Sequence, residues 1–275
     1  MNVMIEKITP NLFFLLIIFS LTGCGDSALT PLQDDSVLGS LQNDDGEHMP
    51  PDQLAQTNLE LGIEYMKLGK YQLALSRFKK ALYAAPNYAD AYSALAILYD
   101  QYLGKVAEAG GYYQRAVELN PHNPDVLNNY GQFLCKTNQW QKADLHFNKA
   151  LENPVYPTPY IPYTNAGICM ARQKKYAKAE SYLHKALNAN PNFGPALYQM
   201  ANIDYERKDY LKAHDYLERY AKAAQHTPQT LWLGVRVERA LNNRDAEATY
   251  AIALRSKYPH TEETQLLNKS VKFYE

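Results

Sequence analysis

The sequence predicts an all-α fold, a right-handed superhelix of about six helix-turn-helix repeats followed by a C-terminal capping helix. Two observations lead to this prediction. Alanine recurs near the start of successive second helices, at steps of 35, 34, 36 and 34 residues, at Ala74, Ala109, Ala143, Ala179 and Ala213. Around each alanine, aromatic residues, leucines and glycines recur at nearly constant offsets. A regular period of this kind indicates one structural unit repeated along the chain.

The period of about 34 residues is typical of the tetratricopeptide repeat (TPR), in which each repeat is a helical hairpin. In residues 55–88, Leu61 and Tyr65 are four apart, so they share one face of the first helix. Gly62 and Ala74 are small, and we expect them where the two helices cross. Pro86 ends the second helix because proline cannot continue one.

The same pattern predicts five further repeats and a last helix. One residue is inserted near Gly104 in the second repeat, and the sixth is degenerate because Glu247 stands where alanine is expected. A final helix would cover the edge that a stack of repeats leaves exposed. The predicted repeats are 55–88, 89–123, 124–159, 160–193, 194–227 and 228–260, and the predicted capping helix is 261–275.

A stack of such hairpins forms a groove lined by the first helix of each repeat. The apolar face of the first repeat suits a peptide or an amphipathic helix as ligand, although any one of these side chains could simply be an exposed surface residue. From the phase of the helices we expect these residues to line the groove: Leu59, Ile63, Met66, Ile97, Asp100, Gln101, Asn128, Gln132, Lys136, Tyr198, Asn202, Tyr205, Trp232, Arg236 and Arg239.

The N-terminus has the pattern of a lipoprotein signal. An apolar stretch, residues 12–21, is too short to span a bilayer and fits a secretory signal. It ends in Leu21-Thr22-Gly23-Cys24, which looks like a bacterial lipobox. We therefore expect a signal peptide over 1–23 and acylation of Cys24. The alternative is an ordinary signal or short buried segment with a chance cysteine. Gly25 rather than aspartate follows, which favours the periplasmic face of the outer membrane.

The predicted segment 24–54 consists of the acylated Cys24 and an acidic linker. Between residues 25 and 53 it contains no lysine or arginine and seven acidic residues. Low hydrophobicity with uncompensated charge predicts a segment without a packed core. It could be a leash that holds the repeats away from the lipid or a passive spacer.

Two cysteines remain if Cys24 is acylated. Cys135 and Cys169 fall near the C-terminal ends of first helices in neighbouring repeats. In an oxidising periplasm such a pair can form a disulfide. The alternative is two small buried residues at a tight helix contact.

Composition and motifs argue against other classes of function. The 275-residue chain has a net charge of -1 and no basic stripe, which argues against nucleic-acid binding. No glycine-rich phosphate loop, paired-cysteine metal motif or nucleophile elbow is found, and no histidine has a second one three or four residues away. We therefore expect no catalysis, cofactor, metal or small-molecule substrate.

The lipobox, the acidic linker and the repeats together resemble one family, the lipoproteins of type IV pilus biogenesis and stability of the PilW/PilF type. Three stretches strengthen the resemblance: Leu127–Cys135 (LNNYGQFLC), Asn153–Pro157 (NPVYP) and Leu231–Arg236 (LWLGVR). The cysteine pair at 135 and 169 is similar to a pair in some members and absent from others.

The resemblance implies a pilotin, a protein that binds the type IV pilus secretin subunit and promotes its outer-membrane localisation and multimerisation. Two alternatives come from other classes. One is a TPR lipoprotein scaffold for outer-membrane or cell-wall assembly machinery. The other is an enzyme within the solenoid, such as a glycosyl hydrolase, which would need a close carboxylate pair in a deep pocket.

Overall fold

The structure, a computed structural model, describes residues 49–271, and within that range it contains helices and no strand. The predicted all-α TPR superhelix is confirmed. The predicted signal peptide (1–23), Cys24, most of the predicted linker and the last four residues of the predicted capping helix lie outside the described residues.

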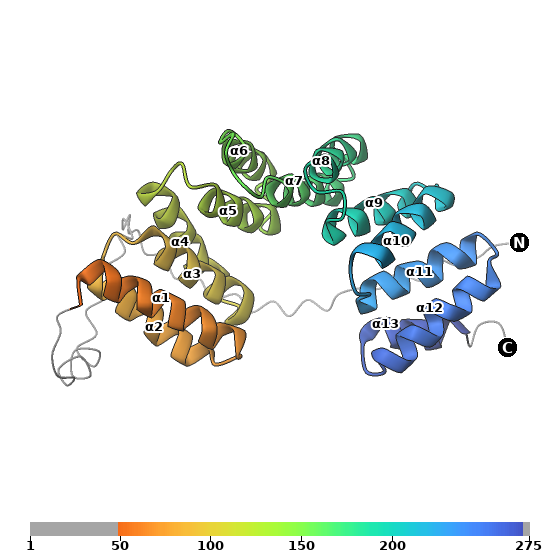
Figure 1. Cartoon of the computed structure of the whole chain (residues 1–275), viewed down its shortest axis with the longest axis horizontal. Coiled ribbons are helices and arrows are strands. Elements are labelled where there is room, and N and C mark those ends of the chain that lie inside the picture. The colour runs from red at the N-terminus through yellow and green to blue at the C-terminus, as the bar shows by residue number, and fades with distance from the viewer. Residues whose placement is uncertain (1–48, 272–275) are drawn as a thin grey trace, which may run out of the picture. The chain divides into compact units, whose positions relative to one another are not determined.

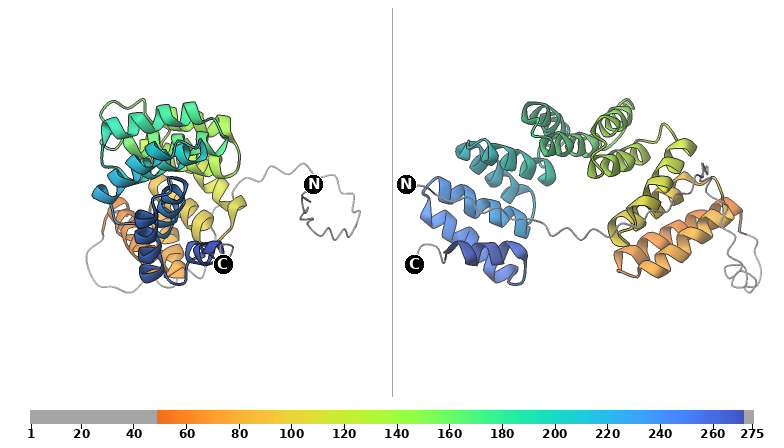
Figure 2. Two further views of the ribbon diagram at one scale, coloured as in Figure 1. Left: turned by 90° about the vertical axis from the view of Figure 1, so that its right-hand side faces the viewer. Right: turned by 180° about the vertical axis from the view of Figure 1, so that it is seen from behind.

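The helices form hairpins that follow one another in chain order (Figures 1 and 2). Each second helix contacts the first helix of the next hairpin. The first helices are α1 (Pro51–Lys67), α3 (Ala89–Ile97), α5 (Pro124–Lys136), α7 (Tyr160–Arg172), α9 (Gly194–Glu206) and α11 (Pro228–Ala240). The second helices are α2 (Tyr71–Ala84), α4 (Val106–Leu119), α6 (Trp140–Ala150), α8 (Tyr176–Ala189), α10 (Tyr210–Ala223) and α12 (Arg244–Lys257). A π-helical segment, η2 (Leu98–Tyr102), continues α3, and α13 (Glu262–Val271) follows α12.

Each hairpin turns at one residue in the left-handed backbone region, with φ between 57° and 70°. Glycine and asparagine adopt this conformation at little cost, whereas other residues are strained by about 1 kcal/mol or more. Lysine occupies this position in two hairpins. The strain of its left-handed backbone therefore lowers the net stability of those two turns. The six residues are Gly69, Gly104, Asn138, Lys174, Lys208 and Asn242.

Small residues let the two helices of a hairpin approach closely. All five recurring alanines are 0% exposed. On the facing helix, Gly131 lies against the ring of Phe147, and a Cβ at that glycine would be 2.7 Å from a ring carbon. The same relation joins Gly62 to Phe78. A large ring thus fills the space beside each of these glycines. This explains why the crossing requires the small residues that the sequence predicts there.

The inserted residue of the second repeat is accommodated in η2. In the other five hairpins a backbone bond across the turn joins residues five apart, such as Lys70 N–H to Tyr65 C=O. In the second hairpin the matching bond joins residues six apart, Lys105 N–H to Tyr99 C=O, at 2.9 Å. Leu103 N–H also donates to Leu98 C=O, the i-to-i−5 pattern of a π-helix. One extra residue thus widens a single turn and leaves the repeat intact.

The first helix begins earlier than the predicted linker boundary at residue 54. Helix α1 starts at Pro51, and Pro50 precedes it with an extended backbone. Proline suits the first helical position because its fixed φ is helical and its missing N–H is not needed there. Residues 51–54 are therefore helical, which corrects the linker end. Leu54 is half-buried, and the outer face of α1 is largely polar.

At the other end, α13 packs on the sixth hairpin. Leu267 is 1% exposed and belongs to one apolar cluster with Leu231 and Val235 of α11 and Leu254 of α12. Glu247 is half-buried and accepts a hydrogen bond from Arg239 Nε at 2.8 Å. An ion pair thus stands where the other hairpins have a buried alanine, while Gly234 still lies against the ring of Tyr250.

Candidate functional site

The first helices contact one another in a row, α1 with α3, α3 with α5, and so on to α11. On this row, between η2, α5 and α7, lies a pocket of about 380 Å³. We call it the central groove pocket. Its lining includes Asp100, Gln101, Gln132, Lys136, Ile168 and Arg172. Four of these six, all but Ile168 and Arg172, are among the residues predicted to line the groove.

An ion pair crosses the central groove pocket between two repeats. Lys136 Nζ on α5 lies 2.8 Å from Asp100 Oδ1 on η2 and 3.3 Å from the Asp100 carbonyl oxygen. The Asp100 side chain is 5% exposed, whereas Lys136 is 48% exposed. The π-helical turn carries Asp100, so the extra residue of the second repeat contributes to this wall. The pair neutralises both charges and leaves the Gln101 and Gln132 side chains exposed beside it.

Three of the predicted groove residues are buried, Asp100 among them, and the two that do not line the central groove pocket correct the prediction. Leu59 is 8% exposed and packs in the core of the first hairpin with Phe78 and Ala55. Asn128 is 4% exposed, and its Oδ1 accepts a hydrogen bond from Asn165 Nδ2 on α7 at 2.9 Å. Both side chains hold helices together and offer no surface to a partner.

The remaining predicted residues of the first two repeats pack partly against the core. Ile63 and Met66 are half-buried on the first core cluster, and Ile97 is half-buried beside Tyr99 and Phe133. Each leaves part of its apolar surface exposed.

A second group of predicted residues gathers on α9 and α11. We call Tyr198, Tyr205, Trp232 and Arg236 the aromatic–arginine cluster. The guanidinium carbon of Arg236 lies 4.6 Å from the centre of the Tyr205 ring and 5.8 Å from that of Trp232. Burial raises the pKa of Tyr198, and the positive charge of Arg236 opposes this increase. Asn202 is half-buried on α9.

Arg239 is the exception among the predicted residues of α11. It lies one turn beyond Arg236, and its guanidinium is held by Glu247 of the same hairpin. Its charge is already neutralised inside the sixth repeat.

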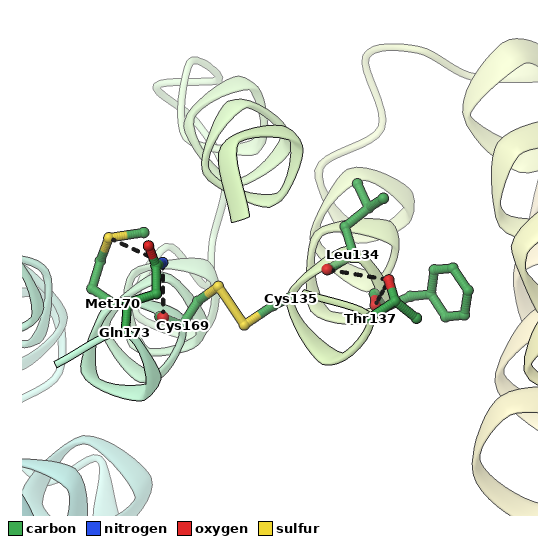
Figure 3. Close-up of a disulfide and its surroundings, with 7 residues drawn as sticks. Leu134, Cys135, Thr137, Cys169, Met170 and Gln173 are labelled. Carbon is green, nitrogen blue, oxygen red and sulfur yellow. Dashed lines mark hydrogen bonds between the residues drawn. A yellow bond between two sulfur atoms is a disulfide. The ribbon is translucent and has the colours of Figure 1, made fainter. Parts of the chain in front are cut away.

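The two cysteines of the repeats form a disulfide in the wall of the central groove pocket. Cys135 of α5 is bonded to Cys169 of α7, with their Cα atoms 5.7 Å apart (Figure 3). Both residues are buried, at 4% and 0% exposed, and Cys135 lines the pocket. The bridge joins two first helices that are consecutive in the row.

The connector between α6 and α7 is tied to the start of α5. The Tyr156 hydroxyl donates a hydrogen bond to Asp125 Oδ1 at 2.6 Å, and burial together with this bond raises the pKa of Tyr156 to about 12. Val155 next to it is 83% exposed.

Sequence reasoning missed two buried acids. Asp204 and Glu238 occupy the place that leucine or methionine takes in the third and fourth repeats, at Leu134 and Met170. Asp204 is 4% exposed, its Oδ2 has no hydrogen-bond partner within residues 49–271, and burial and nearby carboxylates raise its pKa to about 6. The signal was available, because an acid stands where the repeat pattern calls for an apolar residue.

Residues 49–271 contain neither a metal-binding cluster nor a membrane-spanning helix. No group of three or more histidine, cysteine, aspartate or glutamate side chains in that range could hold a metal ion. None of the helices described there has the length and hydrophobicity to cross a membrane.

Comparison with known families places the chain among TPR proteins. Tetratricopeptide repeat family models match residues 59–124, 112–144 and 170–231.

Comparison with individual proteins is more specific. The chain is 30% identical to the type IV pilus assembly protein PilF of Pseudomonas aeruginosa over 215 residues, which cover 78% of this chain and 84% of that protein. The solved structure of Pseudomonas aeruginosa PilF matches with a TM-score of 0.68 at 29% identity, covering 81% of this chain and all of that one. The crystal structure of PilW, described as a widely conserved type IV pilus biogenesis factor, matches with a TM-score of 0.71 at 33% identity, covering 78% of this chain and 98% of that one. The chain therefore belongs to the PilF/PilW family of type IV pilus TPR proteins.

Proposed function

We propose that this protein is an outer-membrane lipoprotein that binds the secretin subunit of a type IV pilus through its groove, and that it promotes secretin localisation and multimerisation. The observation that carries the proposal is the likeness to PilF, a type IV pilus assembly protein, over most of both chains. The lipobox at Cys24 supports the membrane anchor, and the exposed central groove pocket supports a polypeptide ligand.

The mechanism joins two binding events and makes or breaks no bond in the partner. The acyl chains on Cys24 give membrane affinity, at about 0.8 kcal/mol for each buried methylene. The groove holds a secretin segment, so the secretin acquires that affinity while it is bound. Confining both molecules to one membrane surface also raises their effective concentration.

The central groove pocket can be tested without disturbing the core. Gln101 and Gln132 are exposed and line it, so the double substitution Gln101→Arg/Gln132→Arg would fill the opening with two charged side chains. We expect the double variant to lose secretin capture in a pull-down and to abolish heat-stable secretin multimers in cells. The matched control is Gln141→Arg, a glutamine on α6 that is also exposed but does not line the pocket.

The anchor is tested separately. A Cys24→Ala variant should fold normally and still bind secretin in solution, but it should fail to bring secretin to the outer membrane. If secretin assembles normally with this variant, the transfer of membrane affinity is wrong. If the wild-type protein captures no secretin at all, the proposed partner is wrong.

A further inference from the structure

The aromatic–arginine cluster contains a cation, Arg236, whose buried Nε donates no hydrogen bond within residues 49–271. Arg236 is half-buried on α11, and its guanidinium lies over the Tyr205 ring of α9 and near the Trp232 ring one turn earlier on α11. Its Nε is buried and has no hydrogen-bond partner within residues 49–271. The rings fix the direction of the guanidinium and also shield it from water.

Other half-buried arginines of the described chain are satisfied. Arg77 bonds Asn58, Arg115 bonds Asn87 and Glu118, and Arg239 bonds Glu247. Arg236 makes no comparable hydrogen bond or ion pair with any residue from 49 to 271. A desolvated donor without an acceptor is unfavourable, and more so when it is charged. The position of Arg236 therefore costs stability in the free protein, and an acceptor supplied by a ligand would offset this cost.

Among residues 49–271, Arg236 is the cation of this cluster that no neighbouring carboxylate engages. Arg239, one turn away, is already engaged by Glu247. Glu263 of α13, whose charge acts on Tyr198, accepts a hydrogen bond from Gln229 at 2.7 Å. The guanidinium offers a planar set of donors that matches a carboxylate, and partial exclusion of water strengthens such a bond.

We propose that the aromatic–arginine cluster binds an acidic side chain of the polypeptide that occupies the groove, with the carboxylate on Arg236 and the adjoining apolar groups on Trp232 and Tyr205. This inference rests on the proposed function, because it requires a polypeptide in the groove. It adds the chemistry of one anchor point, on the two repeats that follow the central groove pocket along the row of first helices.

The test uses the full-length protein and short overlapping peptides that tile the periplasmic part of the pilus secretin subunit, with binding followed by fluorescence anisotropy. We expect the bound peptides to contain an aspartate or glutamate whose replacement by asparagine or glutamine weakens binding about tenfold or more. Arg236→Gln should weaken binding of the acidic peptide by a similar factor and leave the neutral peptide unchanged, since both changes remove the same bond. Arg236→Lys should restore binding only in part, because lysine keeps the charge and loses the planar fork.

The matched control is Arg244→Gln, an exposed arginine at the start of α12 outside the cluster, which should bind as the wild type does. A second readout needs no substitution. The Nε–Hε resonance of Arg236 in the wild-type protein should shift when the acidic peptide is added and stay in place with its neutral counterpart. This measurement decides the matter even if Arg236→Gln fails to fold.

The outcomes separate the inference from the function on which it rests. If peptides bind but neither acid replacement nor Arg236→Gln changes their affinity, the acidic anchor is wrong and the proposed function stands. If binding depends only on a free C-terminal carboxylate and is lost on amidation, the assignment to an acidic side chain is also overturned. If no secretin peptide binds the wild type, both proposals fall.

Discussion

His214 of the fifth repeat donates a hydrogen bond to the buried carboxylate of Glu238 in the sixth, with Nδ1 2.6 Å from Oε1. Glu238 is 0% exposed, and its second oxygen accepts from Asn243 Nδ2 at 3.0 Å. An acid in a position that the repeat pattern assigns to an apolar residue is thus held by one partner from each of two hairpins. Its environment makes stability depend on pH.

The hydrogen bond to Glu238 raises the pKa of His214 above its usual value of 6.5, although burial opposes the increase. A basic group whose pKa is raised on folding stabilises the native state below its unfolded pKa, and the contribution is lost as pH rises through the folded value. We therefore expect the free energy of unfolding to fall as pH increases above about 6.5. Urea unfolding at several pH values should show this fall in the wild type and a smaller one in His214→Gln. If the free energy of unfolding depends on pH equally in both proteins, the His214–Glu238 pair does not contribute to the pH dependence.

Asp204 gives a second test of pH dependence, in which the charged form of the side chain is the unfavourable one. Its folded pKa of about 6 lies above the usual 3.8, so the native state loses stability as pH rises from about 4 to about 6. Asp204→Asn removes this loss, and we expect the variant to be more stable than the wild type by about 1–3 kcal/mol at neutral pH. At pH 4 the two proteins should unfold at similar denaturant concentrations. A destabilised variant at neutral pH would mean that the carboxylate has a stabilising partner.

Gly131→Ala tests the close approach of α5 and α6. The added Cβ would lie 2.7 Å from a ring carbon of Phe147, and such overpacking costs about 1–3 kcal/mol. Thermal unfolding should therefore shift to lower temperature. Gly110→Ala is the control, because its Cβ would be 3.3 Å from Phe133 and the ring needs to move only slightly.

Lys208→Gly tests the left-handed turn of the fifth hairpin, where φ is 64°. Glycine relieves the steric cost but is more flexible when unfolded, so we expect a net gain of about 0.5–1 kcal/mol. The comparison is Lys222→Gly, an exposed lysine within α10 that has a helical backbone. There, in the last turn of the helix, the substitution should lower stability by up to about 1 kcal/mol.

Removing the disulfide should destabilise the middle of the chain. Cys135 and Cys169 are 34 residues apart, and a chain-entropy argument for a loop of this length gives about 4 kcal/mol. Guanidinium unfolding of Cys135→Ala/Cys169→Ala should show this loss. A reductant should bring the wild type close to the double variant and leave the variant unchanged.

The sequence was sufficient for the repeat because the residues that define it act locally. A glycine or alanine at the hairpin crossing serves only to let the two helices approach closely. The residue inserted near Gly104 corresponds directly to the π-helical turn. The groove was harder to predict, because one helical face serves both the groove and the contact with the next repeat. Leu59 and Asn128 therefore had the expected phase but are buried.

The environments of Asp204 and Arg236 could not be read from the sequence. The pKa of Asp204 depends on its burial and on Glu180, which belongs to another repeat. The setting of Arg236 depends on an aromatic ring from α9 that meets a side chain from α11. Such properties arise only when residues distant in the chain are brought together.

In an array held together by nearest-neighbour contacts, local opening can begin at any boundary between repeats. The covalent link between α5 and α7 removes one such boundary, because the third and fourth hairpins cannot separate while it is intact. Fraying that starts at either terminus must stop at this point or unfold both hairpins together. If force is applied between residues 49 and 271, these two hairpins should be the last to come apart.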